Sequence, residues 1–124
     1  MAKKILVIDD EEIIIKSLSK LLEKNGFEVF VAKNGQDALV MVEEEDFDLI
    51  LADIRMPGMS GVEAVEQIYK KKQEAQNRRI PAIFITGYAD EAVEAKAKKL
   101  EPLAYIYKPF DTDKLLETIK KALS

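Results

Sequence analysis

The sequence of 124 residues contains neither cysteine nor histidine. Without cysteine the chain can form no disulfide framework and can carry out no thiol chemistry. Without histidine, a serine–histidine triad and a histidine-ligated zinc site are excluded as well. No apolar run approaches the roughly 20 residues that a membrane-spanning helix requires. The function of this protein therefore has to rest on other side chains, such as carboxylates, hydroxyls and amines.

An excess of basic residues is also lacking. The 19 Lys and Arg against 23 Asp and Glu give a net charge of −4, which argues against a nucleic-acid binder because such a protein needs a basic face. Lys3 and Lys4 lead into an apolar run of only four residues, too short for a secretory signal peptide. We therefore expect a soluble cytoplasmic protein without direct contact to nucleic acid or membrane. The length and the 48% of hydrophobic residues suit one domain, residues 1–124, with one core.

Five short strand-like segments alternate with five segments of helical character. The segments at 5–8, 49–52 and 82–85 are uninterrupted apolar runs, which are typical of central parallel strands covered on both faces. The segments at 27–31 and 104–107 carry charged or hydroxylated side chains and are expected at the periphery. The alternation predicts an α/β fold with a parallel sheet and right-handed crossovers.

Capping residues and apolar spacing predict the helices. The candidate N-caps are Asn34, Ser60 and Asp111. In the first helix, apolar residues recur at helical spacing at Ile14, Leu18, Leu21 and Leu22. The basic stretch 70–79 is interpreted as a solvated helix end and loop. The helix that begins at Asp90 has Val93 and Leu100 as nearly its only large apolar residues, so we predict that it is thinly anchored and mobile.

Polar side chains follow four of the five predicted strands. Asp9 and Asp10 follow the first, Asp53 ends the third, Thr86 closes the fourth and Lys108 follows the fifth. The carboxyl ends of parallel strands share one edge, and such sheets bind ligands there. Each residue alone has an ordinary explanation as a turn residue, a helix cap, a strand end or a solvated lysine. Their coincidence at one edge favours a functional site.

The residue types at this edge suit phosphoryl transfer. Converging carboxylates repel one another, and Mg²⁺ relieves this repulsion with the oxygen ligands it prefers. Asp9, Asp10 and Asp53 provide such ligands and include none of the soft groups that zinc favours. A carboxylate beside Mg²⁺ can also attack phosphorus and form an acyl phosphate. Phosphoryl transfer needs positioning and charge neutralisation more than acid–base groups, and Lys108 and the Thr86 hydroxyl could contact the phosphoryl oxygens that Mg²⁺ leaves free.

At this point the sequence resembles the receiver domain of two-component response regulators. The matching motifs are Ile8–Glu11, Asp53–Gly61, Thr86–Gly87 and Lys108–Phe110, and the similarity runs from about Lys3 to Leu123. The resemblance implies a flavodoxin-like, doubly wound sheet of five parallel strands in the order 2-1-3-4-5, with five helices. It also implies a phosphorelay function, with a histidine kinase or a phosphotransfer protein as the phosphodonor.

The resemblance assigns a role to each residue of the site. Asp53 would be the phosphoacceptor, and Thr86 and Lys108 would hold the phosphoryl oxygens. The ligands of Mg²⁺ would be Asp9, Asp10, Asp53 and the backbone carbonyl of Arg55. Tyr105 would be the aromatic switch residue, which turns inward when Thr86 is drawn toward the phosphoryl group. The output surface would consist of the fourth helix, the fifth strand and the fifth helix.

Three further expectations concern the surroundings of this site. The Lys108–Pro109 peptide bond is expected to be cis. Glu101–Ala104 departs from the family pattern, which often has glycine there, so the loop before Tyr105 is open to question. Arg55 and Tyr88 flank the phosphoryl position, and we hypothesise that they slow the attack of water on the acyl phosphate.

Other functions fit parts of the pattern. A Mg²⁺-dependent phosphatase with an aspartyl nucleophile needs an acid two residues after it, where this chain has Arg55. A flavin-binding domain needs a glycine- and hydroxyl-rich loop where Asp9–Glu12 would repel a phosphate. A degenerate receiver that acts only as a binding module is the third alternative. We expect no enzyme beyond self-phosphorylation and self-dephosphorylation at Asp53, and a monomer or phosphorylation-dependent dimer, stand-alone or part of a longer regulator.

Overall fold

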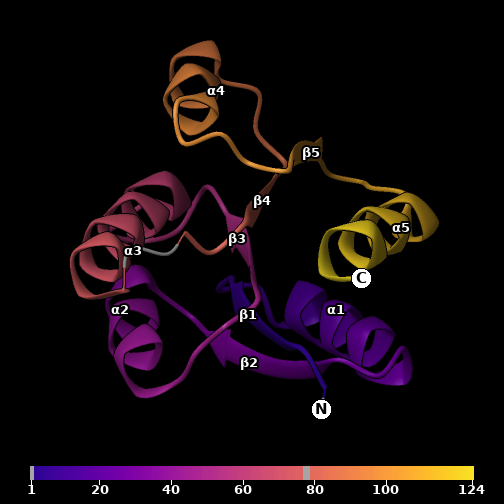
Figure 1. Ribbon diagram of the computed structural model, residues 1–124. Coiled ribbons are helices and arrows are strands. Elements are labelled where there is room, and N and C mark those ends of the chain that lie inside the picture. The colour runs from indigo at the N-terminus through magenta and orange to yellow at the C-terminus, as the bar shows by residue number, and fades with distance from the viewer. Residues whose placement is uncertain (1, 77–78) are drawn as a thin grey trace.

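The structure is a computed structural model that describes residues 2–76 and 79–124, with the backbone alone for 72–76. Asn77 and Arg78, in the stretch that we interpret as solvated, lie outside the described residues. Strands and helices alternate along the chain (Figure 1). The strands are β1 Lys4–Ile8, β2 Glu28–Ala32, β3 Leu49–Asp53, β4 Ala82–Thr86 and β5 Ala104–Tyr107. The helices are α1 Glu12–Lys24, α2 Gly35–Glu44, α3 Gly61–Gln76, α4 Glu91–Lys98 and α5 Thr112–Leu123.

All strands are parallel and lie in the order β2-β1-β3-β4-β5, as expected from the family resemblance. The two strands with polar residues are the edges, and every residue of β3 and β4 is buried. The register pairs Ile8 with Ala52, Asp53 with Ile85 and Thr86 with Tyr107. The polar residues that end these strands therefore reach the same edge of the sheet.

The helices cover both faces of this sheet (Figure 1). α1 and α5 lie on one face, where Leu22 and Leu115 pack against alternate residues of the central strands. α2 and α3 lie on the other face, where Phe47 and Ile68 are fully buried. Burial on both faces explains why the central strands are continuous apolar runs, since neither face of these strands meets water.

The first helix follows its predicted apolar stripe in part, and Ile14 packs against the core. Ile15 is buried together with Leu18 and Leu22, whereas Ile14 and Leu21 are only half-buried. The apolar stripe therefore also includes Ile15 at the start of the helix. Ile13 is 79% exposed, so this run of three isoleucines contributes one buried, one half-buried and one exposed side chain.

The predicted caps are present. Asn34 and Asp111 accept hydrogen bonds from the first-turn N–H groups of α2 and α5, and the Ser60 hydroxyl accepts one from Glu63 N at 3.2 Å. α4 is capped by Asp90 and buries only Ala97, with Val93 and Leu100 half-buried against the core. The predicted shortage of apolar anchors is therefore confirmed. Among the described residues no helix is both long and apolar enough to cross a membrane.

Candidate functional site

Three carboxylates meet at the carboxyl edge of the sheet. Asp53 is the last residue of β3, and Asp9 and Asp10 follow β1 directly. One carboxylate oxygen of each residue lies within 4.8 Å of the others. Asp9 and Asp53 are only 2% and 4% exposed, whereas Asp10 is open to solvent. The structure thus brings together the three residues that the sequence placed in one cluster.

The cluster holds more negative charge than its surroundings compensate. Burial, and next to it the charge of Asp9, raise the pKa of Asp53 to about 6, although Lys108 opposes the shift. Burial also raises the pKa of Asp9, against a hydrogen bond of 2.9 Å that Glu11 N donates to its carboxylate. A cation that accepts oxygen ligands would relieve this repulsion, and the two buried carboxylates with the exposed Asp10 fit such an ion.

Lys108 is the cation beside the cluster. Its Nζ lies 3.7 Å from Asp53 Oδ1 and 3.8 Å from Asp9 Oδ2, but its hydrogen bond, at 3.0 Å, goes to Glu11 Oε1. The Lys108 N–H donates to the Thr86 carbonyl at 2.8 Å, and the Lys108–Pro109 bond is cis, as expected. Burial lowers the pKa of Lys108, but the hydrogen bond to Glu11 and the charges of the two aspartates raise it by more.

Thr86 and two exposed residues form the opposite side of the site. The Thr86 side chain is fully buried, and its hydroxyl accepts a hydrogen bond from Tyr88 N at 3.0 Å. The same hydroxyl lies 3.3 Å from the Tyr88 carbonyl, to which it donates. The Arg55 guanidinium lies 4.2 Å from the centre of the Tyr88 ring, a cation–π contact between the loop after β3 and the loop after β4.

Gly61 packs closely against the backbone of Asp53. A Cβ atom at this position would lie 2.0 Å from the Asp53 carbonyl oxygen, so only glycine permits the observed approach. The Gly61 N–H also donates to the Ile54 carbonyl at 3.0 Å. The first residue of α3 therefore lies directly against the strand end that carries Asp53.

A family model described as the response regulator receiver domain matches residues 5–120. The chain belongs to this family. The same assignment follows from the motifs quoted from the sequence, which contribute the acidic cluster, Thr86 and Lys108.

Individual relatives agree with the assignment. Sporulation initiation phosphotransferase F of Bacillus subtilis (strain 168) is 35% identical to this receiver domain over 99% of the chain and 95% of that protein. Transcriptional regulatory protein ZraR of Salmonella typhimurium is 38% identical over 97% of the chain but only 26% of its own length. The receiver domain therefore spans about a quarter of that regulator. A crystal structure of a CheY-like receiver domain protein from Methanospirillum hungatei JF-1 matches with a TM-score of 0.89 and 35% identity, covering 99% of this chain and 94% of that one.

Tyr105, the predicted switch residue of this receiver domain, lies on β5 with its ring against Phe84 and Tyr107, at 6.4 Å and 5.5 Å between ring centres. Its hydroxyl is buried and has no hydrogen-bond partner among the described residues. Burial, with the nearby charges of Glu94 and Asp90, raises its pKa. The chain therefore adopts a conformation in which the Tyr105 hydroxyl is buried.

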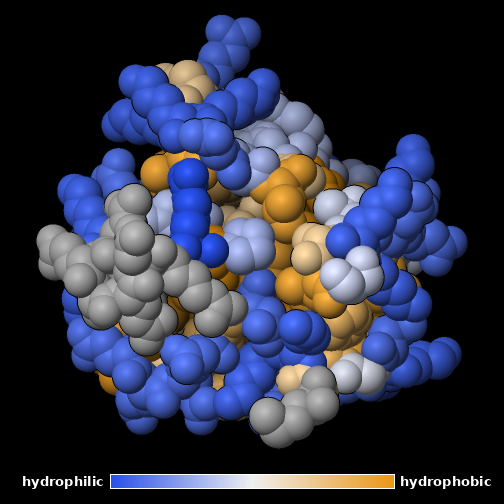
Figure 2. All heavy atoms as spheres, viewed as in Figure 1, coloured by the Kyte–Doolittle hydropathy of each residue, from blue (hydrophilic) through white to orange (hydrophobic). Residues whose placement is uncertain are grey.

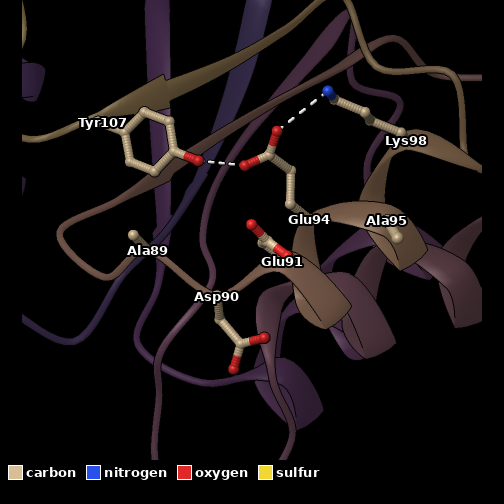
Figure 3. A pocket seen from close by; sticks show the side chains of 7 residues that line it. All are labelled: Ala89, Asp90, Glu91, Glu94, Ala95, Lys98 and Tyr107. Carbon is tan, nitrogen blue, oxygen red and sulfur yellow. Dashed lines mark hydrogen bonds and ion pairs between the residues drawn. The ribbon is translucent and has the colours of Figure 1, made fainter.

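The flank between α4 and β5 holds polar contacts that the sequence did not reveal in full. Tyr107 donates a hydrogen bond to Glu94, which also pairs with Lys98 at 3.0 Å (Figure 3). The Glu94–Lys98 pair follows from its helical spacing, but the Tyr107 contact joins two separate elements. The same applies to Glu11, whose position directly before α1 gave no sign that it binds Lys108. Only the tertiary fold brings these partners together.

Proposed function

We propose that this receiver domain accepts a phosphoryl group on Asp53 from a histidine kinase or a phosphotransfer protein, with Mg²⁺ as cofactor. One observation carries the proposal: a buried carboxylate with a raised pKa lies in a cluster of three carboxylates and within 3.7 Å of a lysine ammonium. Such a site stabilises a transferred phosphoryl group mainly by positioning and charge, and it needs no histidine of its own.

The donor set fits Mg²⁺. The carboxylates of Asp9, Asp10 and Asp53 and the backbone carbonyl of Arg55 would hold the ion, and the exposure of Asp10 leaves room for bound water. The ion would supply positive charge that neutralises phosphoryl oxygens.

The residues of the chain would act on the phosphoryl group in turn. An Asp53 carboxylate oxygen forms a bond to phosphorus while the phosphorus–nitrogen bond of the donor phosphohistidine breaks, and the leaving imidazole retains or takes up a proton. Lys108 moves its ammonium to a phosphoryl oxygen. Thr86 turns its hydroxyl from the Tyr88 backbone toward another oxygen, which frees space near Tyr105. The phosphoryl group thereby selects one of two packings of the chain.

The output surface would consist of α4, β5 and α5. α4 buries little, and Tyr105 lies between the site and this flank, so a movement of Thr86 has a short path to the surface. In Figure 2, apolar atoms are exposed in a band between β5 and α5 on an otherwise largely hydrophilic face. Leu103 is 45% exposed, and Ile106 and Leu116 are half-buried. A protein partner or a second phosphorylated copy would bind here.

This function makes the chain a signalling protein of the cytoplasm that catalyses only its own phosphorylation and dephosphorylation. A phosphatase with turnover is disfavoured because Arg55 stands where the leaving-group acid belongs. A purely binding receiver is disfavoured because the acidic cluster, Thr86 and Lys108 all lie at the site.

The test is intact mass spectrometry after incubation with Mg²⁺ and acetyl phosphate, with the Asp53→Asn variant alongside. The parent is expected to gain one phosphoryl group and the variant none. Equal gains in both proteins would show that a residue other than Asp53 is the phosphoacceptor. No gain in the parent would contradict the proposed phosphoacceptor function.

A further inference from the structure

Among the described residues, the anion closest to the Lys108 ammonium is Glu11, not the predicted phosphoacceptor. Glu11 Oε1 lies 3.0 Å away, within hydrogen-bond distance, whereas the oxygens of Asp53 and Asp9 lie at 3.7 Å and 3.8 Å. Lys108 has 15% of its side chain exposed and Glu11 has 58%. The lysine is thus enclosed at the site while its partner extends from the solvent side.

The position of Glu11 in the helix supports a specific role for this contact. Glu11 occupies the N-cap position of α1, where a side chain ordinarily accepts hydrogen bonds from the first turn. Its side chain makes no such bond. The carboxylate is directed to Lys108 instead, while the Glu11 N–H donates to Asp9. Glu11 is also not one of the three residues whose oxygens form the acidic cluster.

We propose that Glu11 is a positioning residue that holds Lys108 away from Asp53 and gives it up when a phosphoryl group arrives. The proposal rests on the function proposed for Asp53. A phosphoryl group brings about two negative charges and competes with Glu11 for the same ammonium. Because Glu11 is largely exposed, its carboxylate can be rehydrated when Lys108 leaves, so the exchange is reversible. Glu11 thereby lowers the affinity of the site for the phosphoryl group.

The test uses the whole chain with beryllofluoride as a phosphoryl mimic, titrated by calorimetry at saturating Mg²⁺. Glu11→Gln is expected to bind beryllofluoride about three- to tenfold more tightly, because a lysine that is no longer paired with Glu11 is freer to contact the anion. The rate of phosphorylation by acetyl phosphate is expected to rise by a similar factor. Mg²⁺ alone is expected to bind no more tightly than in the parent, because the variant has lost a negative charge near the ion.

Two further variants separate the contact from the charge. Glu12→Gln removes the same charge one residue away, from a carboxylate that pairs with Lys33 outside the site, and is expected to match the parent. Glu11→Asp keeps the charge but shortens the reach to Lys108, so it is expected to resemble Glu11→Gln.

Three results would overturn the proposal. One is that Glu11→Gln binds beryllofluoride like the parent while the parent is phosphorylated normally, which leaves the function of Asp53 intact. Another is that Glu12→Gln tightens binding as much as Glu11→Gln, which would reduce the effect to net charge. The third is that Glu11→Asp retains the parental affinity. A parent that takes up neither beryllofluoride nor a phosphoryl group would overturn the proposed function together with this role.

Discussion

The edge of the sheet that carries Asp53 and the flank formed by α4 and β5 are stabilised by different kinds of interaction. At the edge, two aspartates are almost fully buried and repel each other beside one lysine. At the flank, α4 buries only Ala97, and the exposed Tyr107 and the partly buried Glu94 connect it to β5. Charges respond strongly where they are buried and weakly where water screens them. A charge added at the edge is therefore expected to change the energy of the folded state more than the same charge added at the flank.

The largest effect is expected from removing the buried charge. Asp53→Asn should raise the free energy of unfolding by about 2–3 kcal/mol at about pH 7.5 in the presence of a chelator, because the folded protein then no longer has to hold a carboxylate whose pKa is about 6. The native state binds this proton more tightly than the unfolded chain. The penalty is therefore complete above the folded pKa and disappears as the pH falls toward the ordinary value of 3.8. Urea unfolding at both ends of this range measures it.

The matched control is Asp10→Asn, which removes an exposed carboxylate from the same cluster. Its gain in stability is expected to be under about 1 kcal/mol. If Asp53→Asn stabilised the protein equally at about pH 4 and about pH 7.5, burial of the charge would not be the cause.

On the flank, backbone conformation is expected to matter more than charge. Glu101 adopts a φ of 53° directly before Pro102, a conformation that favours glycine. Glu101→Gly should stabilise the protein by about 0.5–1 kcal/mol in thermal or urea unfolding. Glu101→Ala, which loses the carboxylate but keeps the unfavourable φ, is expected to show no such gain. A gain in stability in both variants would show that the Glu101 side chain, and not its backbone conformation, destabilises the parent.

The Arg55–Tyr88 stack joins the loop after β3 to the loop after β4 beside the site. Replacing both residues with alanine should speed the hydrolysis of the acyl phosphate about threefold, because water gains access to phosphorus. The rate is followed as loss of the phosphorylated mass after the donor is removed. Tyr88→Phe keeps the ring and is expected to match the parent. An unchanged rate in the double variant would contradict the hypothesis.

The smallest effect is expected from the contact between β5 and α4. Tyr107→Phe removes the hydrogen bond to Glu94 and should increase amide hydrogen exchange in α4 about twofold, with little change in α3. The exposed Tyr88→Phe serves as the control for loss of a tyrosine hydroxyl. Equal exchange rates in parent and Tyr107→Phe would show that α4 is held by its apolar contacts alone.

The sequence predicted the sheet better than the contacts between side chains. Apolar runs identified β1, β3 and β4 because burial on both faces leaves no alternative composition. The apolar stripe of α1 was incomplete. Leu18 and Leu22 are buried and Ile14 packs against the core as the spacing indicates, but only the packing against the sheet decides that Ile15 is buried as well.

The residues of the site were predictable, and the partners of Lys108 and Tyr107 were not. Asp9, Asp10, Asp53, Thr86 and Lys108 follow strands, so parallel pairing alone brings them to one edge. The hydrogen bonds to Glu11 and Glu94 join residues from different elements through long, flexible side chains. Many such pairs satisfy the same charges, and the sequence carries no signal that selects among them.

The close approach of Gly61 to the Asp53 carbonyl leaves no space between the end of β3 and the start of α3. The end of β3 and the start of α3 are therefore expected to keep a constant distance from each other. In the part of the chain that the structure describes, α4 shows no comparably close backbone approach to a strand. Under the proposed switch, a pair of distance probes on α3 and α4 is expected to report phosphorylation as a change in one distance. A second pair within β3 and α3 is expected to report no change and serves as the reference.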